Sequence, residues 1–284
     1  MKTKKLLPVL ISVFAALAIM IISCEKNDTG SISDEELQIS EDDALVTTIF
    51  NDAYNDVEDE LSRLQLKSTE TFICKSVEHV WNNDTLIITI TYNGECQVEF
   101  NGKLHWKSGK IIMKRFGGRY YEAGSTKILT FVDYYVDSAK IEGTKTIVSE
   151  GYNADSLSIT FNINLEGGKL TFPDGMYLTR DAQKTRVMHF KENKVVDHYL
   201  INGSANGINI FGDEYSRTLT DLWIEPGCPF IMSGNVLIEI EGKSPINIDY
   251  GNETCDAFAT VTRNGESKDI ELRLRWRRRL RIFR

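Results

Sequence analysis

Five cysteines offer the most specific chemistry in this chain, and the first of them stands apart from the others. Cys24 follows three lysines within residues 1–5 and a mostly apolar run that contains Pro8, and charged residues come directly after it. The run has about 17 residues, whereas a membrane-spanning helix needs about 20. A basic start, a short apolar run and small residues before the cut are typical of an export signal, so we expect residues 1–23 to be removed.

Cys24 resembles the cysteine of a bacterial lipoprotein signal, which becomes the first mature residue and is lipidated, although Ile21 departs from the usual pattern. Several acyl chains such as palmitate hold a protein firmly, because one chain alone binds a membrane only marginally. The resemblance predicts a protein anchored through Cys24 in the outer membrane of the cell envelope, on its surface or periplasmic face. An ordinary signal peptide with a chance cysteine is the alternative. Residues 24–39 are polar and predict a flexible tether.

The other four cysteines form an even set, as expected for disulfides in an exported protein. Three pairings are possible. Segments 74–102 and 228–265 echo each other: each runs cysteine, strand, turn, strand, cysteine and then an Asn-Gly turn. This echo suggests a duplication and favours the pairs Cys74 with Cys96 and Cys228 with Cys255. Free buried thiols or a metal site are the alternatives, but no pair has the Cys-x-x-Cys spacing of zinc sites.

Catalytic signatures are sparse. The four histidines do not have a metal-ligand spacing, and Ser204 in INGSANG lacks the Gly-x-Ser-x-Gly frame, so a turn is expected there. The turn that holds Asp249, Glu253 and Asp256 could bind calcium but does not match the EF-hand, and a strand-end turn is favoured. We therefore predict no catalytic residue, no metal and no cofactor.

Adjacent tyrosine pairs are the candidate ligand-binding residues, since neighbouring residues on a strand face opposite ways and one ring of each pair can point outward. Such a ring can stack on a sugar or a peptide, and core packing explains these residues equally well. The pairs are Tyr120 with Tyr121 and Tyr134 with Tyr135.

One helix and many strands must position these residues. Residues 40–64 place apolar residues at three- and four-residue spacing, from Val46 to Leu61, and predict an amphipathic helix capped by Ser40 with Asp43. The row Asp52, Asp56 and Glu60 could hold a cation, but a solvated face is expected.

Beyond residue 65 the pattern has period 2, with β-branched and aromatic runs separated by Gly, Asn and Asp turns. The sequence offers no helices for parallel crossovers, so we expect residues 65–272 to form an antiparallel β-sandwich or a curled meander of about a dozen strands. The fold is thus mainly β, with one N-terminal amphipathic helix.

Charge divides the chain unequally. The net charge is −8, and removing residues 1–23 leaves 30 basic against 41 acidic residues, a poor composition for binding nucleic acid. Residues 273–284 hold seven arginines. A final strand with a basic face is favoured there over an arm for lipopolysaccharide phosphates.

The helix FNDAYNDVEDEL, the segment from Ser108 to Ile147 and the ending DYGNETCD with ATVTRNG together resemble a family of uncharacterised Bacteroidetes lipoproteins. The resemblance implies an envelope location and a β-rich fold, with no activity to carry over. In that group Asp-Ser or Asp-Thr before an apolar residue looks like an O-glycosylation signal, which Thr85, Ser138 and Ser156 fit. The first hypothesis is a non-enzymatic protein that binds a glycan, a peptide or an envelope protein, or that is a structural surface component; a polysaccharide hydrolase with a carboxylate pair is the alternative.

Overall fold

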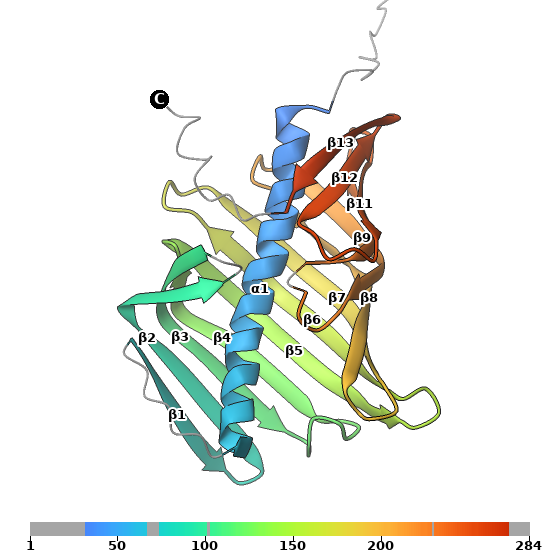
Figure 1. Ribbon diagram of the computed structural model, residues 1–284. Helices are drawn as coiled ribbons and strands as arrows, with labels where there is room; N and C mark the ends of the chain where they lie inside the picture. Colours follow the sequence, from blue (N-terminus) through green and yellow to red (C-terminus); the bar gives the residue numbers. More distant parts are fainter. Residues whose placement is uncertain (1–31, 67–73, 101–102, 229, 273–284) are drawn as a thin grey trace, which may run out of the picture.

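One long helix lies across one face of a single curled sheet in this computed structural model (Figure 1). The structure describes residues 32–66, 74–100, 103–228 and 230–272. The helix α1 spans Asp34–Leu66. The sheet has 13 antiparallel strands, each hydrogen-bonded to the next in chain order, which confirms the mainly β class and the meander rather than the sandwich. The strands are β1 (Lys75–Asn82), β2 (Thr85–Phe100), β3 (Lys103–Phe116), β4 (Thr126–Val136), β5 (Ala139–Asn153), β6 (Ser158–Thr171), β7 (Tyr177–Phe190), β8 (Val196–Ile208), β9 (Glu214–Ile224), β10 (Ser233–Ile240), β11 (Ile246–Asn252), β12 (Phe258–Arg263) and β13 (Glu266–Glu271).

The helix begins earlier than the sequence predicts. Ser33 and Glu36 form a capping box, in which the Ser33 amide donates to Glu36 Oε2 (2.8 Å) and the Glu36 amide donates to Ser33 Oγ (3.3 Å). Ser40, the predicted cap, lies inside the helix and donates its hydroxyl to the Glu36 carbonyl. Residues 34–39, predicted as tether, are therefore helical.

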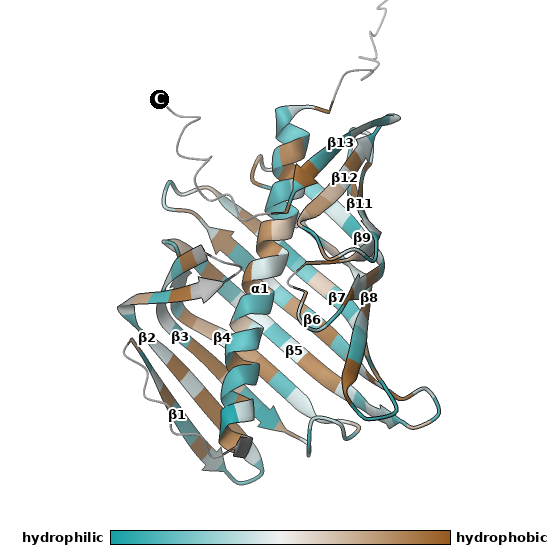
Figure 2. Ribbon diagram, in the orientation of Figure 1, coloured by the Kyte–Doolittle hydropathy of each residue, from teal (hydrophilic) through white to brown (hydrophobic). Residues whose placement is uncertain are grey.

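Apolar residues alternate with polar ones along the strands, and the apolar stripe of α1 is buried against them as predicted (Figure 2). Two core clusters result. One joins the C-terminal part of α1 to strands from β2 to β8, and the other joins the start of α1 to strands from β9 to β13. The helix thus bridges two apolar regions of one sheet.

The segment INGSANG is wrongly predicted as a turn, because it lies inside β8. A side chain at Gly207 would place its Cβ 2.0 Å from the Thr179 carbonyl oxygen of β7, so glycine lets these two backbones approach. Ser204 is an exposed residue of β8, between Gly203 and Gly207 in the sequence. Glycine here marks close strand packing rather than the end of a strand.

Both predicted disulfides are confirmed. Cys74 bonds to Cys96 and Cys228 bonds to Cys255, so that one bridge closes the β1–β2 hairpin and the other closes the β10–β11 hairpin. The predicted signal peptide, Cys24 and the arginine-rich tail 273–284 lie outside the described residues. Across the described ranges, no helix has the length and hydropathy required to span a membrane.

Candidate functional site: a basic and aromatic recess beside the helix

The two predicted tyrosine pairs differ in their surroundings. Tyr120 and Tyr121 lie in the β3–β4 loop rather than on a strand, so the prediction that one of them enters the core is wrong, and both are exposed, with ring centroids 5.4 Å apart. On β4, Tyr134 is fully buried, as predicted for one member of a pair, and Tyr135 is half-buried. Exposed stacking surface therefore comes from the loop pair.

The β3–β4 loop is held by hydrogen bonds at both ends and within. Its Gly124 amide donates to the Ser149 carbonyl (2.8 Å), and the Tyr121 carbonyl accepts from the Tyr152 amide (3.0 Å). Arg119 donates a guanidinium hydrogen bond to the Tyr121 hydroxyl (2.7 Å). Because ordering these side chains is already part of folding, the loop presents its rings at a reduced entropic cost.

Acidic side chains of α1 pair with basic side chains of the strands. Asp52, Asp56 and Glu60 face neither solvent nor a metal cation, which corrects the predicted solvated face. Partners in these pairs occur from β1 to β12. The pairs are Glu60 with Lys75, Asp52 and Asp56 with Lys107, Glu58 with Lys127, Asp43 with Arg180 and Arg217, and Glu36 with Arg263.

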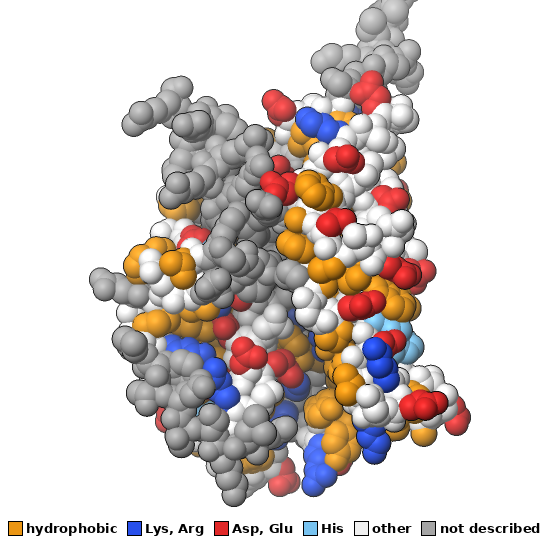
Figure 3. Space-filling model, in the orientation of Figure 1, with side chains coloured by type: hydrophobic (Ala, Val, Ile, Leu, Met, Phe, Trp, Pro, Cys, Tyr) orange, Lys and Arg blue, Asp and Glu red, His pale blue; other side chains and the backbone are white. Residues whose placement is uncertain are grey.

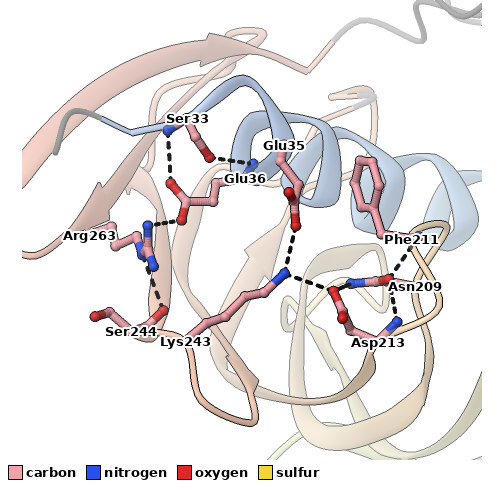
Figure 4. Close-up of polar contacts among 9 residues, drawn as sticks. All are labelled: Ser33, Glu35, Glu36, Asn209, Phe211, Asp213, Lys243, Ser244 and Arg263. Carbon is pink, nitrogen blue, oxygen red and sulfur yellow. Dashed lines mark hydrogen bonds and ion pairs between the residues drawn. The ribbon is translucent and has the colours of Figure 1, made fainter. Parts of the chain in front are cut away.

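The start of α1 shows this arrangement in detail (Figure 4). The Lys243 ammonium lies 2.6 Å from Glu35 Oε1 of the helix and 2.8 Å from Asp213 Oδ2 of the β8–β9 turn. Arg263 reaches the carboxylate of Glu36, which also takes part in the capping box. These contacts fix the helix to the last strands of the sheet.

The hydrolase alternative requires a pair of carboxylates. Asp52 and Asp56 are two neighbouring carboxylates of α1 that share one basic partner. Both bind the Lys107 ammonium, at 2.7 and 2.6 Å, and Tyr92 donates its hydroxyl to Asp56 (2.7 Å). Burial raises the pKa of Asp52 above its ordinary value, although Lys107 opposes the rise. The cluster lies under the helix with Lys107 completely buried, so its geometry is that of a structural ion network.

Three interface cations are left without an acidic partner. Among the described residues, Lys145 of β5 and Lys184 and Arg186 of β7 form no ion pair with a carboxylate, whereas the neighbouring Arg180 and Arg217 share Asp43. Lys145 is buried and donates to the Phe50 carbonyl (3.3 Å). Burial, together with the charge of Arg186, lowers the pKa of Lys145 to about 7.

Aromatic rings surround Arg186. Its guanidinium carbon lies 5.3 Å from the ring centroid of Tyr54, 5.1 Å from that of Phe161 and 5.7 Å from that of Tyr199. The β3–β4 loop is hydrogen-bonded to Ser149 of β5, which is in register with Phe161 of β6, and Phe161 is in register with Arg186 of β7. We name Lys184, Arg186, Tyr199, Tyr120 and Tyr121 the Arg186 recess.

The Arg186 recess is accessible. Lys184, Arg186 and Tyr199 are half-buried, and Tyr120 and Tyr121 are 36% and 37% exposed. In the space-filling view, Lys and Arg side chains are visible beside the lower half of α1 (Figure 3). By contrast, the cavity of about 20 Å³ next to Asp43 and Arg180 has room for about one water molecule.

The remaining predicted residues lie apart from the Arg186 recess. Thr85 is half-buried at the start of β2, and Ser138 and Ser156 are exposed in the β4–β5 and β5–β6 turns. Asp249 lies within β11 and accepts from the Gly251 amide, whereas Asp256 lies in the turn between β11 and β12 and accepts from the Phe258 amide. Sequence reasoning missed Lys184 and Arg186. The available signal was that every second residue shares a strand face, so that Lys184 and Arg186 lie on the same face as the apolar Ala182 and Met188.

Comparison of the chain with protein-family models, curated proteins and solved structures found no match.

Proposed function

We propose that this protein is a lipid-anchored, non-enzymatic binding protein of the cell envelope, related to the uncharacterised Bacteroidetes lipoproteins that its sequence resembles, and that it binds a glycan in the Arg186 recess. The observation that carries the binding proposal is the fixed β3–β4 loop, which exposes Tyr120 and Tyr121 and is hydrogen-bonded to Ser149, two strands from Arg186 in register. Exposed aromatic faces on an ordered loop suit the apolar faces of sugar rings.

The location proposal rests on the N-terminal sequence. Cys24 precedes the first helical residue, Asp34, by a short polar segment, so an anchored chain would hold α1 and the sheet close to the membrane surface. Two disulfides agree with an oxidising compartment outside the cytoplasm.

Glycan binding is tested with purified full-length protein on an oligosaccharide array, followed by calorimetry with the best ligand. Changing Tyr120 and Tyr121 together to alanine should weaken binding at least tenfold, because both aromatic surfaces on which a sugar can stack are removed. Tyr177→Ala is the control, since Tyr177 is 44% exposed on β7 and lies outside the Arg186 recess. Equal binding by all three proteins would reject the recess as the glycan site.

The anchor is tested by metabolic acyl labelling and whole-cell protease accessibility. Wild-type protein should incorporate the label and Cys24→Ala should lose it. Rapid cleavage of the labelled protein on intact cells would place it on the surface, and protection would place it inside the envelope. Retention of label by Cys24→Ala would contradict lipidation at this residue.

The hydrolase alternative lacks a supporting observation in the described structure. It requires two carboxyl groups facing an open cleft, whereas Asp52 and Asp56 are both bound to Lys107 beneath the helix.

A further inference from the structure

The charge of the helix–sheet interface does not balance around β7. Arg180 and Arg217 share the single carboxylate of Asp43, and Lys145, Lys184 and Arg186 add three cations without an acidic partner among the described residues. Buried or half-buried cations are costly unless an anion compensates them. Elsewhere in the interface each strand cation that meets the helix has a carboxylate from α1.

Two guanidinium groups also leave donors unused. The Nε atoms of Arg186 and Arg217 are buried and have no hydrogen-bond partner, although Arg217 is only 1% exposed. An unpaired buried donor costs about 1–3 kcal/mol. Both arginines contact α1, Arg217 at Thr47 and Arg186 at Tyr54, about two turns further along the helix.

Small residues surround Lys184 on the helix-facing side of the sheet. Lys184 is paired across the strands with Gly203, and the neighbouring pair is Ala182 with Ala205. A Cβ atom added to Gly203 would lie 3.1 Å from Lys184 Cγ, so the lysine side chain passes directly over this glycine.

We propose that the Arg186 recess binds an anionic substituent of the ligand, such as a sulfate or carboxylate, between Lys184 and Arg186. This inference rests on the proposed glycan function and names the substrate class as an acidic glycan. The anion supplies the direct ion-pair partner that α1 does not provide to Lys184 and Arg186, although Glu58 of the helix acts on Arg186 at longer range, and the tyrosines at the rim stack on the sugar that carries the anion. Burial and the charges of Arg217, Arg180 and Lys145 lower the pKa of Lys184, and a bound anion would restore its charged form.

Inorganic sulfate, dextran sulfate and neutral dextran are the probes, measured by calorimetry at constant ionic strength. Wild-type protein should bind sulfate saturably and dextran sulfate more tightly than dextran. Lys184→Met and Arg186→Gln should each weaken sulfate binding at least tenfold. Lys114→Met is the control, because Lys114 is exposed on β3 outside the recess. Lys184→Met should fold, since it removes an unpaired cation and no ion pair.

Each outcome decides one claim. Sulfate binding lost in Lys184→Met but kept in Lys114→Met supports the anion site, even if no glycan binds through the tyrosines, in which case the proposed glycan function fails. Equal sulfate binding in all variants indicates an adventitious ion and overturns the site. Tyrosine-dependent binding of neutral glycans with no response to sulfate overturns the anion site and leaves the proposed function standing.

Discussion

At the scale of single residues, the interface separates paired from unpaired charges. Asp43 is the centre of the paired part, because it lies 2.6 Å from Arg180 and 2.7 Å from Arg217, and all three side chains are buried. Such pairs add little net stability when complete, but loss of one member leaves an uncompensated charge. The contribution of these residues to stability is therefore measured best by removing one partner.

Asp43→Ala should lower the free energy of unfolding by about 3–5 kcal/mol, because two guanidinium groups lose their carboxylate. Urea unfolding at pH 7 measures the loss. Asp59→Ala is the matched control on the same helix, since Asp59 is exposed, and its effect should stay within about 0.5 kcal/mol. A similar small loss for both variants would show that Asp43 is not required.

Lys145→Met should raise the free energy of unfolding at pH 7 by roughly 2–4 kcal/mol. In the wild-type protein the buried Lys145 ammonium must either lose its proton or stay charged away from water, and methionine removes this cost. The pKa of Lys145 is lowered to about 7 from 10.5, while Arg186, Glu58 and the Tyr54 ring face it. The unfolded chain binds the extra proton between these values, so wild-type stability should rise with pH across this window. The stability difference between the two proteins should shrink as pH approaches 10. A constant difference from pH 7 to pH 10 would contradict the lowered pKa.

At the scale of elements, the sequence predicted the apolar contacts better than the polar ones. The stripe from Val46 to Leu61 was recognisable because its spacing matches a helix face. Lys107, Lys127 and Lys145 were not recognisable as interface residues, because a lysine on a strand is normally expected on the solvent side. Their burial depends on acids of α1 that are distant in sequence, and no local pattern contains that pairing.

The hairpins closed by disulfides give a prediction at this scale. Replacing Cys74 and Cys96 together by alanine should cost about 3 kcal/mol in the chain-entropy model, and replacing Cys228 and Cys255 should cost about as much. The first change should also speed amide exchange in β1, because this edge strand is mostly exposed and pairs with β2 alone. Unchanged unfolding midpoints under oxidising conditions would show that the bridges add no stability.

At the scale of the whole molecule, α1 packs on two core clusters that lie on different parts of the sheet, one on β2 to β8 and the other on β9 to β13. We expect one cooperative unfolding transition, since loss of the helix exposes both clusters together. A variant in which Trp81, Trp106 and Trp276 are changed to phenylalanine keeps Trp223 as its single tryptophan. Its fluorescence reports on β9, and far-ultraviolet circular dichroism reports on the whole chain. The two signals should change at the same denaturant concentration in this variant, and separate transitions would show that the clusters unfold independently.

The order of the elements has a consequence for how the chain is made. Synthesis produces α1 before any strand, yet its acidic side chains find their partners on strands as late as β12, where Arg263 meets Glu36. Each hairpin can form soon after its second strand is synthesised, because every strand pairs with its chain neighbour. Until the last strands are made, the carboxylates of the helix remain hydrated. The first element to leave the ribosome is therefore the last to complete its contacts with the sheet.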